Sequence, residues 1–156
     1  MSGPYLLAEL QVPDEEAMNQ LGLRVAAQLR AGDLVILVGP LGAGKTTFTR
    51  GVGEALGAVG NVSSPTFVIA RTHKLDGRAE VLVHADAYRL GGVAELDDLD
   101  IDFENSIVMV EWGKGMLDGV ASDWLEIEIE RDHTGESDVR QVRINGFGER
   151  WKSVSF

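Results

Sequence analysis

The chain has 156 residues, 44% of them hydrophobic, and its 25 acidic and 14 basic residues give a net charge of −11. This length predicts one domain with a sound core. No apolar run approaches the roughly 18 residues of a membrane span, and the N-terminus lacks the pattern of a signal peptide. Without cysteine there is no disulfide and no thiolate metal site, so we expect a cytoplasmic protein that contacts no membrane.

The acidic balance argues against tight binding to bare nucleic acid, because such binding relies on contacts from Lys and Arg to phosphate. Two small basic clusters stand out, and we expect both to be solvated surface charges. They are Arg71, His73, Lys74 and Arg78, and Arg140, Arg143, Arg150 and Lys152. If the function involves RNA, a partner is expected to hold most of it.

The first part of the chain predicts a strand, a helix, a buried strand and a second helix. Residues 5–12 are strand-like, and an apolar stripe at four-residue spacing predicts a helix capped by Asp14 that runs to about Arg30. The continuous apolar run 34–38 is typical of a strand buried on both faces. Apolar spacing predicts the next helix over 46–56, with Gly57 as its C-terminal cap.

The second part predicts mostly strands. Residues 66–73 and 79–85 alternate around Asp76-Gly77, which indicates a hairpin. The acidic segment 91–105 predicts a short helix with loops, and strands are expected at 106–112, 124–130 and 139–144. From about Gly146 the pattern weakens, so a tail over 146–156 is expected to fray. The whole order predicts a single α/β domain over residues 1–156, a mixed β-sheet flanked by helices.

Residues 39–46, Gly-Pro-Leu-Gly-Ala-Gly-Lys-Thr, match the phosphate-binding pattern G-x-x-x-x-G-K-[ST]. Glycines let such a loop wrap a phosphate with its backbone N–H groups pointing inward, and the following helix adds its positive end. Lys45 would reach the β- and γ-phosphates, and the Thr46 hydroxyl would bind Mg²⁺. Because the motif lies between a predicted strand and a predicted helix, we expect a P-loop NTPase domain.

Two acids follow apolar strands, where a carboxylate that helps to hold Mg²⁺ is expected. Glu111 ends the run 107–110, and Asp86 ends the run 81–85. Because ligands bind at the carboxyl ends of strands in α/β sheets, both acids are expected to converge on the loop. The alternative for each is a helix-capping or surface carboxylate.

Other polar residues have weaker claims. Thr66, in Ser-Pro-Thr-Phe at 64–67, could contact Mg²⁺ or orient water in a segment that senses the γ-phosphate, although the same residues also suit a plain turn. Arg89 could contact phosphate or pair with an acidic neighbour. His84 is expected to be structural in its strand.

The nucleotide is expected to be ATP by elimination. A GTPase should carry Asn-Lys-x-Asp late in the chain, and the nearest match, His-Lys-Leu-Asp at 73–76, lacks the Asn and comes too early. The D-x-x-G match at 132–135 follows the proposed acid strand and is interpreted as chance. Small-molecule kinases usually have an arginine-rich lid, whereas residues 113–122 contain only Lys114.

Four motifs in order resemble the TsaE family, formerly YjeE, over about residues 10–145. They are Gly-x-Leu-Gly-Ala-Gly-Lys-Thr-Thr-Phe at 39–48, Ser-Pro-Thr-Phe at 64–67, His-x-Asp-x-Tyr-Arg-Leu at 84–90 and Glu-Trp at 111–112. The resemblance implies a bacterial ATPase required for threonylcarbamoyladenosine in tRNA. It also implies TsaB and TsaD as partners, with tRNA reached indirectly through their complex.

The resemblance also implies residue roles. Thr46, Glu111 and Asp86 would hold Mg²⁺, while Lys45, Asp86 and Thr66 would act in catalysis. Residues at or near the nucleotide would be Glu15, Leu41, Gly42, Ala43, Gly44, Lys45, Thr46, Thr47, Trp112 and Gly135.

Three residues depart from the family pattern. Pro40 replaces an Asp in the loop, Ala87 replaces a Leu, and Gly113 replaces the Pro after Glu-Trp. Pro40 removes one N–H donor and stiffens the loop, and it could mean the loss of a catalytic acid at that position. We expect changed rates rather than lost binding.

The leading hypothesis is therefore a Mg²⁺-dependent ATPase that powers or resets a tRNA-modifying complex. No built-in arginine finger is evident, so we expect slow turnover alone, with a partner coupling the cycle. One alternative is a small-molecule phosphotransferase with Asp86 as base toward a substrate hydroxyl. Another is a non-catalytic module whose ATP binding governs assembly.

Overall fold

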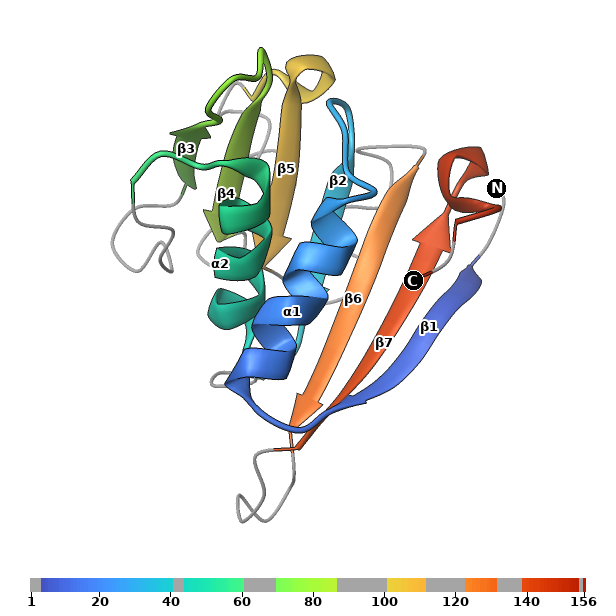
Figure 1. The fold of residues 1–156 in the computed structure, drawn as a ribbon. Coiled ribbons are helices and arrows are strands. Elements are labelled where there is room, and N and C mark those ends of the chain that lie inside the picture. Colours follow the sequence, from blue (N-terminus) through green and yellow to red (C-terminus); the bar gives the residue numbers. More distant parts are fainter. Residues whose placement is uncertain are drawn as a thin grey trace.

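The computed structural model describes residues 4–40, 44–60, 70–86, 101–111, 123–131, 139–154 and 156. The chain folds as one α/β domain around a seven-stranded sheet of order β1-β7-β6-β2-β5-β4-β3 (Figure 1). The strands are β1 Tyr5–Val12, β2 Leu34–Val38, β3 Ala70–Lys74, β4 Val81–Asp86, β5 Ser106–Glu111, β6 Trp124–Arg131 and β7 Arg140–Phe147. The helices are α1 Glu15–Ala26 and α2 Lys45–Leu56, with 3₁₀ turns at Phe103–Asn105 and Glu149–Trp151.

The sheet is mixed, as the element order predicts. β2 pairs in parallel with both β5 and β6, and β4 pairs in parallel with β5. The outer pairings, β1 with β7, β7 with β6 and β3 with β4, are antiparallel. The antiparallel β3–β4 pair confirms the predicted hairpin, with β3 starting at Ala70. Four adjacent parallel strands therefore end at one edge of the sheet.

Helices α1 and α2 lie side by side over the same face of the sheet (Figure 1). Their apolar sides cover Val35 and Leu37 of β2 and the neighbouring strands in one large core cluster. The two helices approach backbone to backbone, because a Cβ built at Gly51 of α2 would lie 2.4 Å from the Asn19 carbonyl oxygen of α1. Gly51 thus fixes how closely α2 packs on α1.

The opposite face of the sheet holds a second, smaller apolar cluster. Leu34 and Ile36 of β2 contribute to it together with Val108 and Val110 of β5. At its margin Trp124 stacks on Phe147 with ring centroids 4.4 Å apart. Strand β2 is therefore buried on both faces, which confirms the expectation from its apolar sequence.

Helix α1 ends at Ala26, before the predicted limit near Arg30. The chain tightens into i→i−3 hydrogen bonds at Gln28 and Leu29, and the Arg30 N–H donates to Asp33 Oδ2 at 2.8 Å. Leu29 continues the apolar stripe and is buried, although it lies outside the helix. The apolar spacing predicted the buried positions correctly. The helix does not extend to Arg30, because the Arg30 N–H donates to the Asp33 carboxylate in place of a helical carbonyl oxygen.

Where the weak pattern predicts a tail free to fray, the structure has ordered chain. Gly146 and Phe147 belong to β7, and the Trp151 side chain is fully buried. Arg150 lies over the Trp151 ring, 4.2 Å from its centroid, and donates from Nε and Nη2 to the two Asp33 carboxylate oxygens at 3.0 Å each. This pair joins the end of the chain to the start of β2.

The described residues include only part of one further predicted helix. The predicted helix within 91–105 lies mostly outside them, and its last part is the 3₁₀ turn Phe103–Asn105. None of the helices in the described ranges has the length and apolarity needed to cross a membrane.

Candidate functional site

The topology of the sheet places the motif of residues 39–46 where α/β proteins bind ligands. After β2 the chain passes through α2 to β4 and β5 on one side, and then returns to place β6 on the other side. Such a switch point opens a crevice beyond the carboxyl ends of the strands. The loop that starts at Gly39 follows β2 directly, so it lies at this crevice.

The loop is closed by a hydrogen bond between its two ends. Lys45 Nζ donates to the Gly39 carbonyl oxygen at 2.9 Å. Gly44, the N-cap of α2, has a φ of 109°, which disfavours residues with a side chain. The lysine is thus folded over the loop, in the place from which it could turn to a phosphate. Leu41, Gly42 and Ala43 lie outside the described residues.

The first turn of α2 leaves its polar groups open to a ligand. No side chain caps the helix at Gly44, and the first turn carries no acidic residue. Thr46 and Thr47 are half-buried there, whereas Thr49 is buried and donates from Oγ1 to the Lys45 carbonyl at 2.9 Å. Uncapped N–H groups and the positive end of a helix favour an anion at this point.

The two predicted acids end neighbouring strands at the same level of the sheet. Asp86 of β4 pairs in register with Glu111 of β5, and Glu111 pairs with Leu37 of β2. The structure therefore brings the two backbone positions together beside the loop. The Glu111 side chain is only 7% exposed. Of the Asp86 side chain, the structure describes nothing.

His84 contacts the Glu111 carboxylate, which the sequence analysis did not foresee. Its Nε2 lies 3.3 Å from Glu111 Oε2. The alignment does not make a hydrogen bond, and within the described residues neither ring nitrogen of His84 has a hydrogen-bond partner. The available signal was the spacing His84-x-Asp86, which puts the histidine two residues before the register partner of Glu111, on the same face of the adjacent strand.

A second histidine, His73 of β3, is buried on the neighbouring strand. Burial lowers the pKa of His73 below its ordinary value of 6.5, and a backbone contact with Val59 offsets part of this effect. Electrostatic interactions with His84 and with Arg71 lower the pKa of His73 further. Its Nε2 also lacks a hydrogen-bond partner in the described part of the chain. His73 therefore favours the neutral form.

Glu15 is the first residue of α1, after the N-cap Asp14, whose Oδ1 accepts from the Ala17 N–H at 2.8 Å. A Cβ built at Gly44 would lie 3.2 Å from Met18 Cε, so this end of α1 adjoins the loop. Glu15 is exposed, and its role beside the nucleotide stays a prediction. Four candidates lie outside the described residues: Thr66, Arg89, Trp112 and Gly135.

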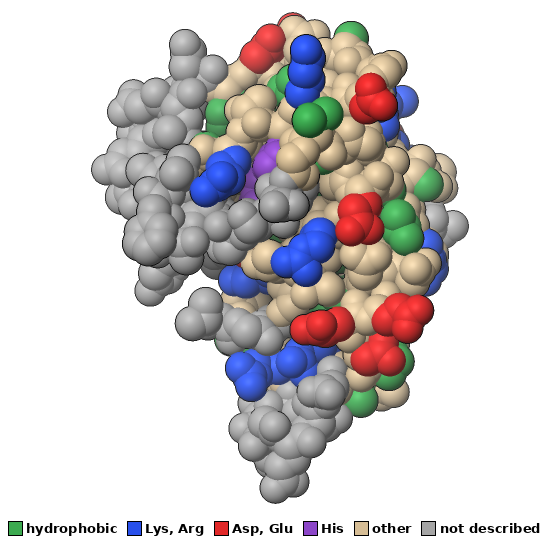
Figure 2. All heavy atoms as spheres, turned by 60° about the vertical axis from the view of Figure 1, so that its left-hand side comes forward, with side chains coloured by type: hydrophobic (Ala, Val, Ile, Leu, Met, Phe, Trp, Pro, Cys, Tyr) green, Lys and Arg blue, Asp and Glu red, His purple; other side chains and the backbone are tan. Residues whose placement is uncertain are grey.

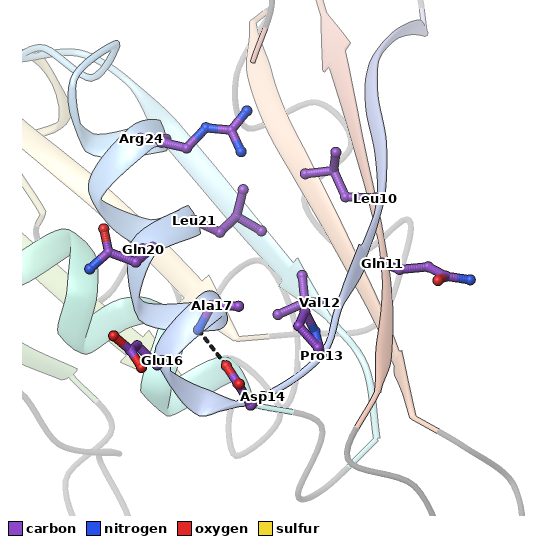
Figure 3. Close-up of a pocket in the computed structure, with 10 residues that line it drawn as sticks. All are labelled: Leu10, Gln11, Val12, Pro13, Asp14, Glu16, Ala17, Gln20, Leu21 and Arg24. Carbon is purple, nitrogen blue, oxygen red and sulfur yellow. Dashed lines mark hydrogen bonds between the residues drawn. The ribbon is translucent and has the colours of Figure 1, made fainter.

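A groove of about 430 Å³ runs between β1 and α1, from Asp14 and Glu16 at one end to Arg24 at the other (Figure 3). Leu10 and Leu21 line its middle. Its described lining includes neither Lys45 nor Thr46, so it is separate from the candidate phosphate site.

Most of the predicted basic clusters consist of exposed or paired charges. Arg78 pairs with Glu80, Arg143 lies 3.7 Å from Glu9, and Arg150 binds Asp33. Figure 2 shows that Lys and Arg side chains stand apart over most of the face beside β3, separated by acidic and other residues. The expectation of solvated surface charges fits the exposed members of the clusters, but it is wrong for His73, which is buried, and for Arg150, whose side chain is 14% exposed and bound to Asp33.

The arrangement can hold a phosphate and a hard cation. Mg²⁺ prefers oxygen ligands, and such oxygens are offered by the Thr46 hydroxyl in the first turn of α2 and by the buried Glu111 carboxylate at the end of β5. No described residue donates a hydrogen bond to that carboxylate. The residues present therefore fit a magnesium ion.

Comparisons with known proteins agree on one family. Residues 12–142 match the model of the family described as Threonylcarbamoyl adenosine biosynthesis protein TsaE. The tRNA threonylcarbamoyladenosine biosynthesis protein TsaE of Streptomyces coelicolor is 54% identical over 88% of this chain and 95% of its own. The protein of that name from Bacillus subtilis is 37% identical over 89% of this chain and 85% of its own.

A comparison of the fold with solved structures agrees with this family. The crystal structure of YdiB from Bacillus subtilis superposes with a TM-score of 0.75, at 27% identity, over 97% of this chain and 92% of that one. The resemblance drawn from the four sequence motifs is thereby confirmed. The chain belongs to the TsaE family, which is involved in the biosynthesis of threonylcarbamoyladenosine in tRNA.

Proposed function

We propose that this protein is a Mg²⁺-dependent ATPase that works in the cytoplasm with TsaB and TsaD homologues, and reaches tRNA through their complex. The observation that supports this most directly is the closed loop at the end of β2, in which Lys45 Nζ bonds the Gly39 carbonyl beside the buried Glu111.

In the proposed mechanism the chain acts mainly by position and charge. The loop amides and the start of α2 would bind the phosphates, and Lys45 would leave the Gly39 carbonyl for the β- and γ-phosphates. Thr46 and Glu111, with Asp86 as a further candidate, would hold Mg²⁺, which neutralises phosphate charge when bound. Asp86 or Thr66 would orient the attacking water. The fixed donors then stabilise charge on the transferring phosphoryl group.

The acidic surface supports a role for partners. With a net charge of −11 and its described basic side chains largely dispersed or paired, the protein has little with which to hold tRNA itself. TsaB and TsaD homologues would hold the tRNA, and ATP turnover would drive or reset their cycle.

The test is phosphate release from Mg·ATP by the protein alone and with TsaB, TsaD and tRNA. We expect slow release that rises with the partners and falls at least about 100-fold in Lys45→Ala. Arg50→Ala is the matched control, because it removes one positive charge from the exposed side of the same helix. Turnover that survives Lys45→Ala would reject the mechanism, and phosphate found on an acceptor molecule would favour the phosphotransferase alternative.

A further inference from the structure

The strongest unexplained feature outside the motif residues is the imidazole of His84. It is fully buried in β4, and neither ring nitrogen has a hydrogen-bond partner among the described residues. A buried polar group without a partner costs folding free energy. The described structure offers it one acceptor nearby, the Glu111 carboxylate, whose Oε2 lies 3.3 Å from Nε2.

We infer that His84 is a positioning residue for Glu111. Its Nε2–H donates to one carboxylate oxygen and thereby turns the other oxygen toward the cation that accompanies the nucleotide. This inference rests on the proposed function, since it takes Glu111 as a ligand of Mg²⁺. It adds a residue whose part is to aim that ligand, without touching the cation or the nucleotide.

Three observations carry the assignment. First, the two side chains belong to adjacent parallel strands, where His84 precedes the register partner of Glu111 by two residues, so backbone pairing fixes their separation. Second, a neutral imidazole donates from only one nitrogen, and the one acceptor in contact lies at Nε2. Third, the pair is 3.3 Å apart without hydrogen-bond alignment, so a modest rotation of either side chain completes the bond.

A hydrogen bond from His84 to Glu111 would orient a carboxylate that binds a metal ion. A carboxylate that ligates a metal usually has its second oxygen held by a hydrogen bond, and loss of such a partner weakens metal binding about 10- to 100-fold. At Glu111 no described residue other than His84 is placed to provide that bond. Without the hydrogen bond from His84, the Glu111 carboxylate would still bind the cation, but with lower affinity, and the phosphates would be placed less well.

The test compares His84→Leu, His84→Gln and a matched control, His73→Leu. His73 is likewise buried with an unpartnered nitrogen, but it lies on β3, one strand further from Glu111. Mn²⁺ binding in the presence of a non-hydrolysable ATP analogue is followed by electron paramagnetic resonance. Nucleotide binding is measured separately in EDTA, and folding is monitored by thermal melting.

We expect His84→Leu to weaken Mn²⁺ binding at least about tenfold. Metal-free nucleotide binding should be unchanged, and His84→Gln, which keeps an N–H donor, should recover most of the affinity. His73→Leu should bind Mn²⁺ like the parent protein. Folded His84→Leu with parental Mn²⁺ affinity would overturn the inference, and so would an equal loss in His73→Leu.

A measurement on the unaltered protein covers the case in which His84→Leu does not fold. The chain has three histidines, and long-range ¹H–¹⁵N spectra resolve their ring nitrogens. Adding Mg²⁺ and the analogue should shift the Nε2 signal of His84 and leave that of His73 in place. An unmoved His84 signal in protein that binds Mg²⁺ would reject the positioning role alone, whereas absence of any nucleotide-linked Mg²⁺ binding would reject the proposed function with it.

Discussion

Two buried acids at opposite ends of the central strands show how one fold separates stability from function. Asp33 precedes β2 and is 6% exposed, while Glu111 ends β5 and is 7% exposed. Asp33 accepts two hydrogen bonds from the Arg150 guanidinium and one from the Arg30 N–H. Among the described residues, the Glu111 carboxylate contacts the His84 ring at 3.3 Å without hydrogen-bond alignment. The first acid thus has its hydrogen bonds from the protein, whereas no described residue donates a hydrogen bond to the second.

The difference follows from the surroundings of each carboxylate, since both are equally buried. A buried charge with a bidentate partner is stable in place but chemically occupied. A buried carboxylate that lacks donors costs stability, and such uncompensated groups gather at functional sites. The amino end of β2 is therefore expected to carry stability, and its carboxyl end to carry binding.

The largest expected effect is at the satisfied acid. Asp33→Ala would leave the Arg150 guanidinium, which is 14% exposed, without its partner, and should lower the free energy of unfolding by about 3 kcal/mol. Urea denaturation measures this, with nucleotide affinity of the folded protein nearly unchanged. Glu9→Ala is the control, because its pair with Arg143 is more than half exposed and should contribute under about 1 kcal/mol. Equal losses of unfolding free energy in the two variants would show that the buried pair of Asp33 and Arg150 stabilises no more than an exposed pair.

A smaller effect is expected from His73 of β3, which pairs with Leu82 near the amino end of β4. Its folded-state pKa lies below 6.5, so as the pH falls the unfolded chain takes up the proton first. The contribution of His73 to stability should therefore be complete above pH 6.5 and decline as the pH falls from there to the folded-state pKa. Urea midpoints at pH 7.5 and 5.5 measure the decline, which His73→Gln should reduce. A decline of the same size in the variant would assign the pH dependence to other groups.

The smallest effect on stability is expected at Glu111 itself. Glu111→Gln removes a buried charge that no described residue satisfies with a hydrogen bond, so the free energy of unfolding should stay within about 0.5 kcal/mol or rise. Mg²⁺-dependent turnover should nevertheless fall. Urea denaturation and phosphate release, measured on the same samples, test the two expectations. If Glu111→Gln lost as much stability as Asp33→Ala, the two acids would contribute equally to stability and the comparison between them would be wrong.

The sequence predicted those features that short-range patterns encode. The apolar run at 34–38 matches β2 residue for residue, and the caps Asp14 and Gly57 lie where predicted because each acts on its own backbone within a few residues. The positions of Glu111 and Asp86 followed from a general rule about strand ends, and their pairing in register confirms that the two backbones meet.

Features that depend on contacts between distant residues were not predicted. The His84 contact requires the register between β4 and β5, which no local pattern contains. Arg150 and Trp151 lack periodicity around them, so the order that they give the end of the chain follows only from packing against Asp33 and β7. The early end of α1 has the same origin, since the Asp33 side chain, outside the helix, accepts from the Arg30 N–H beyond its last turn.

The central position of β2 has a consequence for how the chain acquires its structure. Its neighbours are β5 and β6, so Leu34 pairs with Val108 and Val35 with Leu125. Pairings between residues so distant in sequence form late and slow folding. During synthesis, β2 emerges early, but it can pair with β5 only after Ser106–Glu111 has left the ribosome and with β6 only after Trp124–Arg131 has followed. Strand β2 thus gains its second neighbour late, and a chain cut short before β6 would leave one edge of this apolar strand unpaired.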